Sequence, residues 1–458
     1  MSPSGPHPTL PVNSSPPRRH FGTDGVRGVA NSELGVDLVM GLARAAGEPV
    51  GGGVVVVGRD TRRSGPMLVA ALAAGFHSVG VDTFDAGVIP VGGVSALVTE
   101  LGADLGVMVS ASHNPAPDNG IKFLDADGFK LDDEREADIE ARLSLGAPWR
   151  CPTGAAVGAG RALPDATDRY LASIGSHASG SLEGVRLALD CANGAAYRAA
   201  PRLFASLGAD VATFFADPDG MNINDGCGAT SPERLAPEMG AGGQIGFCFD
   251  GDADRLIALD EDGRVVNGDV IMAIIALHLK SRGELAGNRV VTTVMSNLGF
   301  RRSMREAGIE LLETQVGDRY VVAAMREHGA VLGGEQSGHV IQLDRGTTGD
   351  GLLTALRLLE VVVRERRPLA DLRREAMTEF PQVLVNLPVR SQDLDRAKGL
   401  EEAITAAEAE LGDDGRVLVR ASGTEPLVRV MVEAARAETA DSIAHRLAGV
   451  VREELGRV

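Results

Sequence analysis

One unit of structure, a strand followed by a polar turn, a helix and a second strand, occurs three times along the chain. The copies are VVVVGRDTRRSGPMLVAALAAGFHSVGVDTF from residue 54, LALDCANGAAYRAAPRLFASLGADVATFF from residue 187 and VVTTVMSNLGFRRSMREAGIELLET from residue 290. Their strands are continuous apolar runs, which are typical of parallel sheets that helices cover on both faces. The repeat predicts an α/β fold of several similar domains in series, although such units also occur in α/β proteins without a repeat.

The end of the chain follows a different plan. RVLVRASGTEPLVRVMVEA, from residue 416, consists of two strands around a tight loop, between the helical patterns LDRAKGLEEAITAAEAEL and ADSIAHRLAGVVREEL. This order predicts an antiparallel α+β domain. We therefore expect three α/β domains with mixed, largely parallel sheets at 18–164, 165–267 and 268–379, an α+β domain at 380–458, and a central cleft between the four.

Length and composition predict a soluble protein of several domains. A chain of 458 residues exceeds the size of one hydrophobic core, and no apolar run reaches the roughly 18 residues of a membrane helix. Residues 1–17 contain six prolines and no apolar stretch, so we expect a disordered tail and no signal peptide. The four cysteines lack paired spacing, which indicates reduced side chains and a cytoplasmic protein.

The formal net charge of -18 argues against nucleic acid or an anionic membrane as a partner. If the ligand is itself an anion, the protein must gather its basic side chains locally to bind it.

A serine follows the apolar strand GVMVSA, where the chain breaks into SHNPAPDNG. Ser112 is a poor candidate for a hydrolase nucleophile, because the only nearby base is its neighbour His113 and no G-x-S-x-G surrounds it. Lys122 comes ten residues later and lies near the same strand end. It could bind a phosphate, or transfer a proton if its pKa is depressed, and the alternative is an ordinary turn with a surface lysine.

Three aspartates follow a second apolar strand, in FCFDGDADRLIALD. Asp250, Asp252 and Asp254 would repel one another unless a cation lies between them, and carboxylate oxygens suit Mg²⁺. A calcium loop of the EF-hand type is excluded, because Arg255 stands where that loop requires glycine. An aspartyl phosphatase, with Asp250 as its nucleophile, and a solvated acidic turn stay open as alternatives.

Three further loops suit a sugar phosphate. FGTDGVRG at 21–28 combines glycines with Arg27, and GGEQSGHVI at 333–341 offers groups that bind vicinal hydroxyls. RASGTEPLVR at 420–429 joins two arginines and two hydroxyls in a phosphate cradle. Together with the serine and the metal loop, these segments indicate phosphoryl transfer on a phosphosugar.

The motifs SASHNP, DGDADR, GEQSGH and RASGTEP occur in the order found in the α-D-phosphohexomutases, and the chain resembles this family from Phe21 onward. FGTDGVRG and GGEQSGH resemble the bacterial members that act on glucosamine phosphates. The resemblance implies an intramolecular phosphotransferase, an isomerase that interconverts glucosamine 6-phosphate and glucosamine 1-phosphate for UDP-N-acetylglucosamine and peptidoglycan synthesis. Mannose or glucose phosphates are the alternative substrates within the family.

The resemblance also implies roles for single residues. Ser112 would be a phosphoserine that forms a 1,6-bisphosphate intermediate, and it would bind one Mg²⁺ per chain together with Asp250, Asp252 and Asp254. The implied catalytic residues are Ser112, Lys122, Arg255, His339 and Arg27. The implied substrate-binding residues are Arg319, Glu335, Ser337, Arg420, Ser422, Gly423, Thr424 and Arg429. A hexosamine or hexose 1,6-bisphosphate is expected as primer, and a homodimer as the assembly.

Two functions outside the mutase class stay open. A Mg²⁺-dependent sugar phosphatase would release inorganic phosphate, and a non-catalytic sensor would bind the sugar phosphate without turnover. For a mutase, the bisphosphate must turn without escaping, so we expect the last domain to hinge open and shut.

Overall fold

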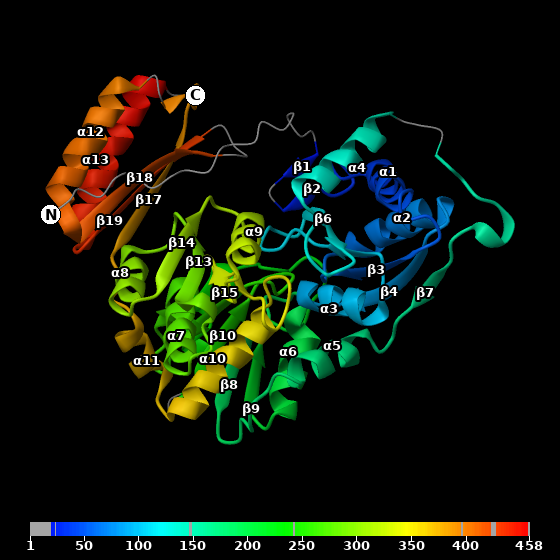
Figure 1. The fold of residues 1–458 in the computed structure, drawn as a ribbon, viewed down its shortest axis with the longest axis horizontal. Coiled ribbons are helices and arrows are strands. Elements are labelled where there is room, and N and C mark those ends of the chain that lie inside the picture. The colour runs from blue at the N-terminus through cyan, green and yellow to red at the C-terminus, as the bar shows by residue number, and fades with distance from the viewer. Residues whose placement is uncertain are drawn as a thin grey trace.

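The computed structural model describes residues 20–22, 24–145, 149–240, 243–394, 397–422 and 427–456. The predictions for the tail at 1–17 and for Gly423 and Thr424 lie outside these residues. The described chain forms four β-sheets, and each sheet falls inside one of the four expected segments (Figure 1). The domain boundaries themselves stay a prediction.

The first sheet is mixed and has helices on both faces. Its strands, in spatial order, are β1 (Phe21–Gly22), β2 (Gly25–Val29), β6 (Asp118–Asp125), β5 (Leu105–Val109), β3 (Val54–Arg59), β4 (Asp82–Val88) and β7 (Gly160–Ala162). Its helices are α1 (Val36–Gly47), α2 (Gly65–Ser78), α3 (Val91–Leu101) and α4 (Asp133–Leu145). Alternate residues of β3 enter different cores: Val55 and Val57 pack with α1 and α2, and Val56 packs with α3.

The second and third sheets repeat this plan with fewer strands. The second contains β12 (Val265–Val266), β11 (Leu256–Leu259), β10 (Ile245–Phe249), β8 (Arg186–Asp190) and β9 (Asp210–Phe214), with α5 (Ala166–Gly175) and α6 (Ala196–Ser206). The third contains β14 (Glu310–Thr314), β13 (Arg289–Thr293), β15 (Leu332–Gly334) and β16 (Val340–Gln342). Around it lie α7 (Gly268–Ser281), α8 (Leu298–Glu306), α9 (Asp318–His328), α10 (Gly351–Glu365) and α11 (Leu369–Ala376).

The predicted repeat is confirmed by the strand pairing. In each copy the two strands are parallel neighbours, namely β3 with β4, β8 with β9, and β13 with β14. The connecting helices are α2, α6 and α8. Short 3-10 helices lie at Gly154–Ala156, Gly228–Thr230, Pro232–Arg234, Ala236–Glu238, Ala286–Asn288 and Gly412–Asp414.

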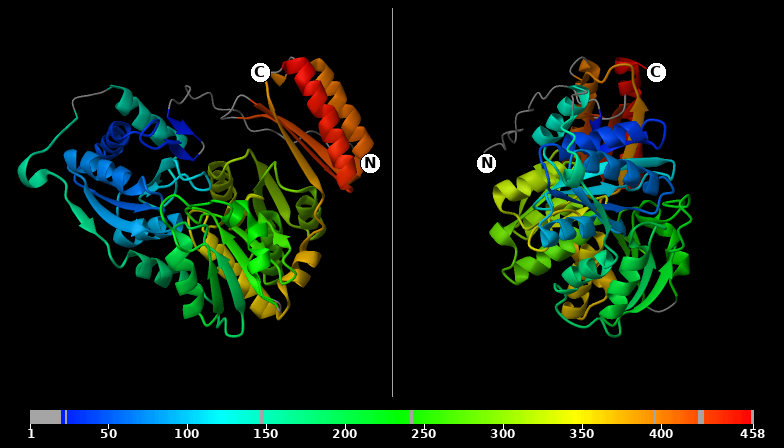
Figure 2. Two further views of the ribbon diagram at one scale, coloured as in Figure 1. Left: turned by 180° about the vertical axis from the view of Figure 1, so that it is seen from behind. Right: turned by 90° about the vertical axis from the view of Figure 1, so that its right-hand side faces the viewer.

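The fourth sheet is antiparallel, as predicted, in the order β17 (Gln382–Pro388), β19 (Leu427–Ala434) and β18 (Gly415–Ala421). Helices α12 (Lys398–Leu411) and α13 (Ala437–Leu455) cover its outer face, away from the rest of the chain (Figures 1 and 2). This unit has a hydrophobic core of its own, whereas one continuous core runs through the first three units. The first three units are therefore packed as one body.

Polar contacts join the fourth unit to the third. The Arg416 guanidinium donates to the backbone oxygens of Val294 at 3.0 Å and Ser296 at 2.6 Å. It also pairs at 2.6 Å with Glu433, whose carboxylate accepts the Leu298 N–H at 3.0 Å. Such contacts can exchange with water more readily than a shared apolar core can.

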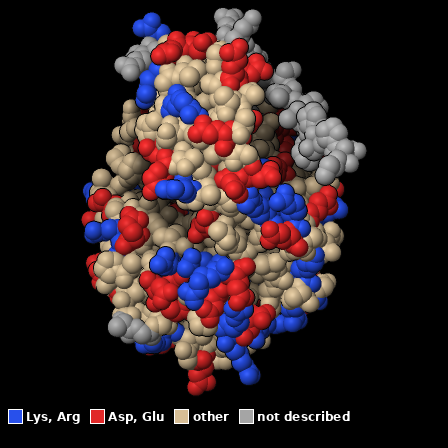
Figure 3. Space-filling view, turned by 90° about the vertical axis from the view of Figure 1, so that its left-hand side faces the viewer, with Lys and Arg blue, Asp and Glu red and all other residues tan. Residues whose placement is uncertain are grey.

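None of the helices in the described ranges has the length and apolar character needed to cross a membrane. On the side of the molecule in Figure 3, acidic and basic side chains are interspersed. The net negative charge of the chain is therefore not gathered into one patch on that side.

Candidate active site

Ser112 lies just after β5, in a loop that a buried arginine holds in place. The Arg62 guanidinium donates to the backbone oxygens of Ser112 at 2.9 Å, Asn114 at 2.7 Å and Asp118 at 3.0 Å. Its Nε–H donates to the Asp60 carboxylate at 2.8 Å, and both side chains are fully buried. Arg62 was not predicted as a site residue, although the charged run directly after an apolar strand, in GRDTRRSG, was a signal for it.

The loop turns sharply at Ser112 itself. Ser112 has a φ of 51°, in the left-handed region that a non-glycine residue adopts only when its surroundings hold it there. Its Oγ–H donates to Asp250 Oδ2 at 2.5 Å, and its backbone N–H donates to Ser110 Oγ at 2.9 Å. The strand therefore ends where the hydroxyl reaches the metal loop.

The three aspartates of the metal loop come together as predicted. Their carboxylates are buried, with one oxygen of each within 4.8 Å of the others. Burial, together with repulsion by Asp254 and Asp252, raises the pKa of Asp250 well above its usual value. Within the described chain, Asp252 Oδ1 and Asp254 Oδ1 have no hydrogen-bond partner. This set of buried oxygens with open positions fits a hard divalent cation.

Lys122, on β6, is a buried counter-ion of these carboxylates. Its Nζ lies 2.7 Å from Asp252 Oδ2, 2.8 Å from Asp24 Oδ2 and 3.5 Å from Asp254 Oδ2. Burial alone would lower the pKa of Lys122, but these carboxylates raise it well above its usual value. The alternative of a surface lysine is therefore wrong, and the condition for proton transfer, a depressed pKa, is not met in this state.

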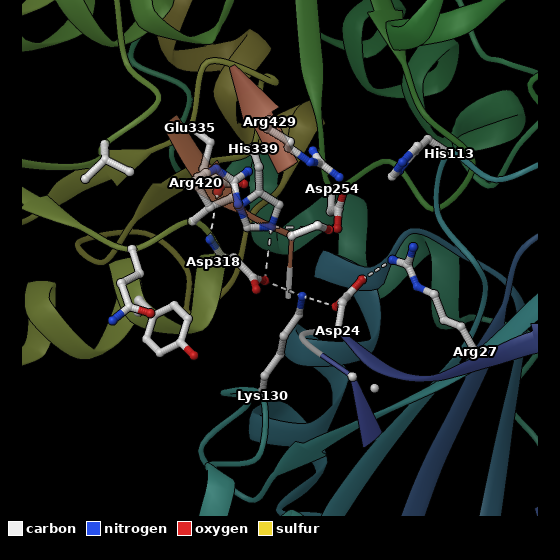
Figure 4. A pocket seen from close by; sticks show the side chains of 18 of the residues that line it. Asp24, Arg27, His113, Lys130, Asp254, Asp318, Glu335, His339, Arg420 and Arg429 are labelled. Carbon is white, nitrogen blue, oxygen red and sulfur yellow. Dashed lines mark hydrogen bonds and ion pairs between the residues drawn. The ribbon is translucent and has the colours of Figure 1, made fainter. Parts of the chain in front are cut away.

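Further charged side chains, alternately basic and acidic, continue these ion pairs across a cavity beside the metal loop (Figure 4). Asp24 pairs with Arg27 and with Lys130, and Lys130 also pairs with Asp318. Burial raises the pKa of Asp318, but Lys130 and His339 outweigh it and lower the pKa. Asp24, Lys130 and Asp318 were not predicted as site residues. Asp24 lies inside the motif FGTDGVRG, and Asp318 directly precedes Arg319, which was predicted, whereas Lys130 lies in no motif.

His339 and Arg255 lie opposite each other on paired backbone segments beside the metal loop. His339 Nε2 is 3.6 Å from Asp254 Oδ2 and 3.5 Å from Asp318 Oδ2. The Arg255 Nε lies 3.8 Å from Asp254 Oδ1. Both predicted residues therefore approach the aspartates from the cavity side.

His113, the neighbour of Ser112, faces the same cavity (Figure 4). Burial and the nearby Arg255 and Arg27 lower the pKa of His113 to about 4. Its Nδ1 lies 3.3 Å from Ser112 Oγ, so a neutral imidazole stands beside the serine.

A cavity of about 900 Å³ lies between the four units. The first unit contributes Arg27 and His113, the second Asp254 and Arg255, and the third Glu335 and His339; the fourth contributes Arg420, Ser422 and Arg429. Arg420 and Arg429 are directly opposite on β18 and β19, and burial with the charge of Arg429 lowers the pKa of Arg420. Two like charges in this register favour a bound anion.

Two predicted binding residues are not among the described residues that line this cavity. Arg319 pairs with Asp133 and with Glu136 of α4, the latter at 3.1 Å, and donates to the Gly22 oxygen at 3.1 Å. Ser337 is exposed in the loop between β15 and β16. Four predicted site residues are buried next to the cavity and do not line it, namely Ser112, Lys122, Asp250 and Asp252. Asp254 and His113, which do line it, connect these residues to the cavity.

Family models match most of the chain. They are described as phosphoglucomutase/phosphomannomutase alpha/beta/alpha domain I at residues 18–146, alpha/beta/alpha domain III at residues 267–380 and C-terminal domain at residues 384–450.

Similar proteins extend over nearly the whole length. The chain is 51% identical to a phosphoglucosamine mutase of Leifsonia xyli, over 95% of this chain and 99% of the relative. It is 53% identical to a phosphoglucosamine mutase of Frankia casuarinae, with the same coverage. A crystal structure of a phosphoglucomutase/phosphomannomutase family protein from Burkholderia thailandensis is similar with a TM-score of 0.78 and 30% identity, covering 94% of this chain and 97% of the other.

Proposed function

Since this chain belongs to the phosphoglucomutase/phosphomannomutase family, we propose that it interconverts glucosamine 6-phosphate and glucosamine 1-phosphate. Such an enzyme is an isomerase that acts as a phosphosugar mutase. The observation that carries the proposal is the contact of Ser112 Oγ with Asp250 beside a cavity that has paired arginines on its opposite wall. These two places would hold the reacting and the non-reacting phosphate of one sugar.

In the proposed reaction the phosphate starts on Ser112. Its P–O bond to Oγ breaks, and a bond forms to the C1 hydroxyl oxygen of glucosamine 6-phosphate, which loses its proton. The resulting 1,6-bisphosphate turns in the cavity. The bond from its 6-phosphate to the C6 oxygen then breaks and a P–O bond forms to Oγ; the proton that Oγ took up in the first transfer is lost, and the C6 oxygen takes up a proton, which leaves glucosamine 1-phosphate and the phosphoenzyme.

Asp250, Asp252 and Asp254, with the Ser112 phosphate, would hold one Mg²⁺. A bound Mg²⁺ would neutralise charge on the transferring phosphoryl group. Arg255, Arg27 and Lys122 would add positive charge on the same side. His339, whose ring nitrogens have no hydrogen-bond partner among the described residues, would contact the reacting hydroxyl.

The opposite wall would hold the rest of the substrate. Arg420, Ser422 and Arg429 would grip the phosphate that is not reacting, together with Gly423 and Thr424. Glu335, which lines the cavity, would bind sugar hydroxyls. Ser337 is exposed outside the described lining of the cavity, and its contact with a sugar hydroxyl stays a prediction. Because Arg319 is paired with α4, we propose that it holds the neighbouring Asp318 and Tyr320 at the cavity.

Several properties accompany this proposal. A hexosamine or hexose 1,6-bisphosphate would prime enzyme whose serine is not phosphorylated. The protein would work in the cytoplasm as a homodimer, and its product would serve the synthesis of UDP-N-acetylglucosamine and peptidoglycan.

Phosphopeptide mapping and a coupled assay test the function together. With Mg²⁺ and a bisphosphate primer, we expect phosphate on Ser112 and faster turnover of glucosamine 6-phosphate than of glucose or mannose 6-phosphate. Ser112→Ala should lose both the phosphate and the activity.

Other results would replace the proposal. Preference for glucose or mannose 6-phosphate would assign the chain to another substrate of the family. Release of inorganic phosphate in proportion to sugar consumed, without isomer, would indicate a phosphatase.

A further inference from the structure

The backbone of the metal loop, residues 250–255, is contacted by the starts of three helices. The oxygen of Gly251 accepts the Ala195 N–H at 2.8 Å, that of Asp252 accepts the Val91 N–H at 3.0 Å, and that of Ala253 accepts the Gly351 N–H at 2.8 Å. Val91 and Gly351 are the first residues of α3 and α10, and Ala195 directly precedes α6. Three successive carbonyl groups of the loop are thus held by helices from three different units.

This arrangement suits a loop with three buried carboxylates. The first N–H groups of a helix have no partner within the helix and carry partial positive charge, so they favour negative groups nearby. Ala253 has a φ of 59°, an unfavourable conformation for alanine that needs such external contacts. With its carbonyls bound to the helices, the loop is fixed in the shape that gathers the carboxylates of Asp250, Asp252 and Asp254.

Glycine allows two of the helices to come this close. A Cβ atom on Gly351 would lie 2.5 Å from the Arg255 backbone oxygen. A Cβ atom on Gly92, in the first turn of α3, would lie 2.1 Å from Asp350 Oδ2. The starts of α3 and α10 are therefore packed against each other and against the loop without room for a methyl group.

Asp350 fixes the start of α10, and Tyr170 of α5 fixes Asp350. Asp350 Oδ1 accepts the backbone N–H groups of Leu352 at 2.9 Å and Leu353 at 3.0 Å, as the N-cap of the helix. Its Oδ2 accepts the Tyr170 O–H at 2.8 Å, and both side chains are buried. The Tyr170 hydroxyl is thus hydrogen-bonded to Asp350, which caps α10 and is followed in the chain by Gly351, whose N–H donates to the Ala253 oxygen in the metal loop.

We propose that Tyr170 and Asp350 are positioning residues for the divalent cation: through the N-terminus of α10 they hold the metal loop in its binding shape. Neither residue touches the cation or the sugar. This inference rests on the proposed metal site, and its test uses metal binding in the absence of any substrate.

The test measures Mn²⁺ binding to the full chain by electron paramagnetic resonance, with Mg²⁺ as competitor. Loss of partners that orient metal ligands lowers affinity roughly 10- to 100-fold, and because Tyr170 acts one layer further out, we expect about a three- to tenfold rise in the dissociation constant for Tyr170→Phe. Tyr197→Phe, on α6, is the matched control. The described residues include no hydrogen-bond partner for the Tyr197 hydroxyl, so its dissociation constant should equal that of the wild type.

A second pair of variants separates positioning from stability. Asp350→Ala removes the helix cap and should weaken Mn²⁺ binding more than Tyr170→Phe does. Asp350→Asn keeps an oxygen for the cap and an amide that can donate to the Tyr170 hydroxyl, so it should restore most of the affinity.

Each outcome decides the proposal. Weaker Mn²⁺ binding in Tyr170→Phe and Asp350→Ala, with recovery in Asp350→Asn, supports it. Unchanged binding in both Tyr170→Phe and Asp350→Ala, with a lowered melting temperature, overturns it and leaves these residues a structural role. If the wild-type chain binds no Mn²⁺, the proposed metal site itself fails, and the inference fails with it.

Discussion

The charged side chains of the site are mostly paired with one another before a substrate arrives. Lys122 contacts Asp24 and Asp252, and Lys130 contacts Asp24 and Asp318. These pairs join residues that are distant in the chain. In the fourth unit Arg420 and Arg429 face each other as like charges, and burial together with the charge of Arg429 lowers the pKa of Arg420.

Replacing one of these arginines should therefore weaken substrate binding without lowering the stability of the folded chain. Arg420→Met should raise the KM for glucosamine 6-phosphate about 10- to 100-fold, because a hydrogen bond to a charged group contributes roughly 1.5–3 kcal/mol. The unfolding free energy should stay the same or rise, since a like-charge contact is removed.

The control is Arg436→Met, whose side chain is exposed at the start of α13. Steady-state kinetics on both variants check the prediction, which is contradicted if the two KM values agree.

Arg62 should be needed for the shape of the Ser112 loop. Arg62→Met leaves the Asp60 carboxylate buried without its partner, which should lower the unfolding free energy by about 3–5 kcal/mol. The degree of Ser112 phosphorylation should fall as well, because the loop loses the hydrogen bonds that Arg62 donates to four of its backbone oxygens.

Urea unfolding and intact mass measure the two effects. Arg142→Met serves as the comparison, since Arg142 pairs with Asp138 on the surface of α4. A loss below about 1 kcal/mol for Arg62→Met, as is typical for surface pairs, would show that the loop holds its shape without this arginine.

Residues that end a strand inside a distinctive motif could be predicted from the sequence. Ser112 and the three aspartates each follow an apolar run, and the structure brings them together. Lys130 could not be found this way, because its importance comes from Asp24 and Asp318, which only the folded chain brings near it. Arg319 was predicted as a substrate-binding residue, yet its partners on α4 decide which way its side chain points.

At the scale of single elements, strand ends and helix starts hold buried carboxylates with altered acidity. Burial raises the pKa of Asp190, at the end of β8, to about 6 and that of Asp350, before α10, to about 6. Burial also raises the pKa of Asp269, in the first turn of α7, to about 7. Each of these groups therefore holds its proton to a higher pH in the folded chain than in the unfolded chain.

Asp269 makes the unfolding free energy of the chain depend on pH. The folded chain keeps this proton up to about pH 7, whereas the unfolded chain loses it near pH 4, so the folded state binds more protons between these values. The contribution to the unfolding free energy is therefore greatest at low pH and falls as pH rises through about 7.

Asp269→Asn should remove this dependence, because the amide oxygen can still accept the Asn297 N–H that donates to Asp269 at 2.7 Å. The variant should gain about 2–3 kcal/mol relative to the wild type between about pH 5 and 8. Denaturant unfolding at several pH values measures the gain, and a constant difference between the two proteins would contradict the assignment.

The repeated elements could be predicted because their apolar runs and helical patterns are local properties of the chain. The parallel pairs β3 with β4, β8 with β9, and β13 with β14 follow from that pattern. The pairing of β6 with β2 was not foreseen, because pairing of segments distant in the chain depends on tertiary contacts.

At the scale of the whole molecule, the division of the hydrophobic cores suggests which part can move. The first three units share one core, whereas the fourth has its own and meets the third through Arg416 and Glu433. We expect the fourth unit to rotate toward the cavity when a sugar phosphate binds Arg420 and Arg429.

Fluorescence energy transfer can follow this motion. Cys151 is exposed and the other three cysteines are buried, so one dye can be placed on Cys151 and a second on Asp441→Cys of α13. Glucosamine 6-phosphate should shorten this distance and narrow its distribution.

A second dye on Glu306→Cys of α8, in the third unit, supplies the control, and its distance to Cys151 should not change. If both distances change equally, or neither changes, a separate movement of the fourth unit is ruled out.

The contacts of the metal loop also bear on how the protein is made. The loop at 250–255 needs Val91, Ala195 and Gly351 for its three backbone hydrogen bonds, and Gly351 is the last of these to be synthesised. A nascent chain therefore cannot complete the loop until residue 351 has left the ribosome. A shortened product that ends before α10 would carry the serine and all three aspartates and would still lack the fully assembled site.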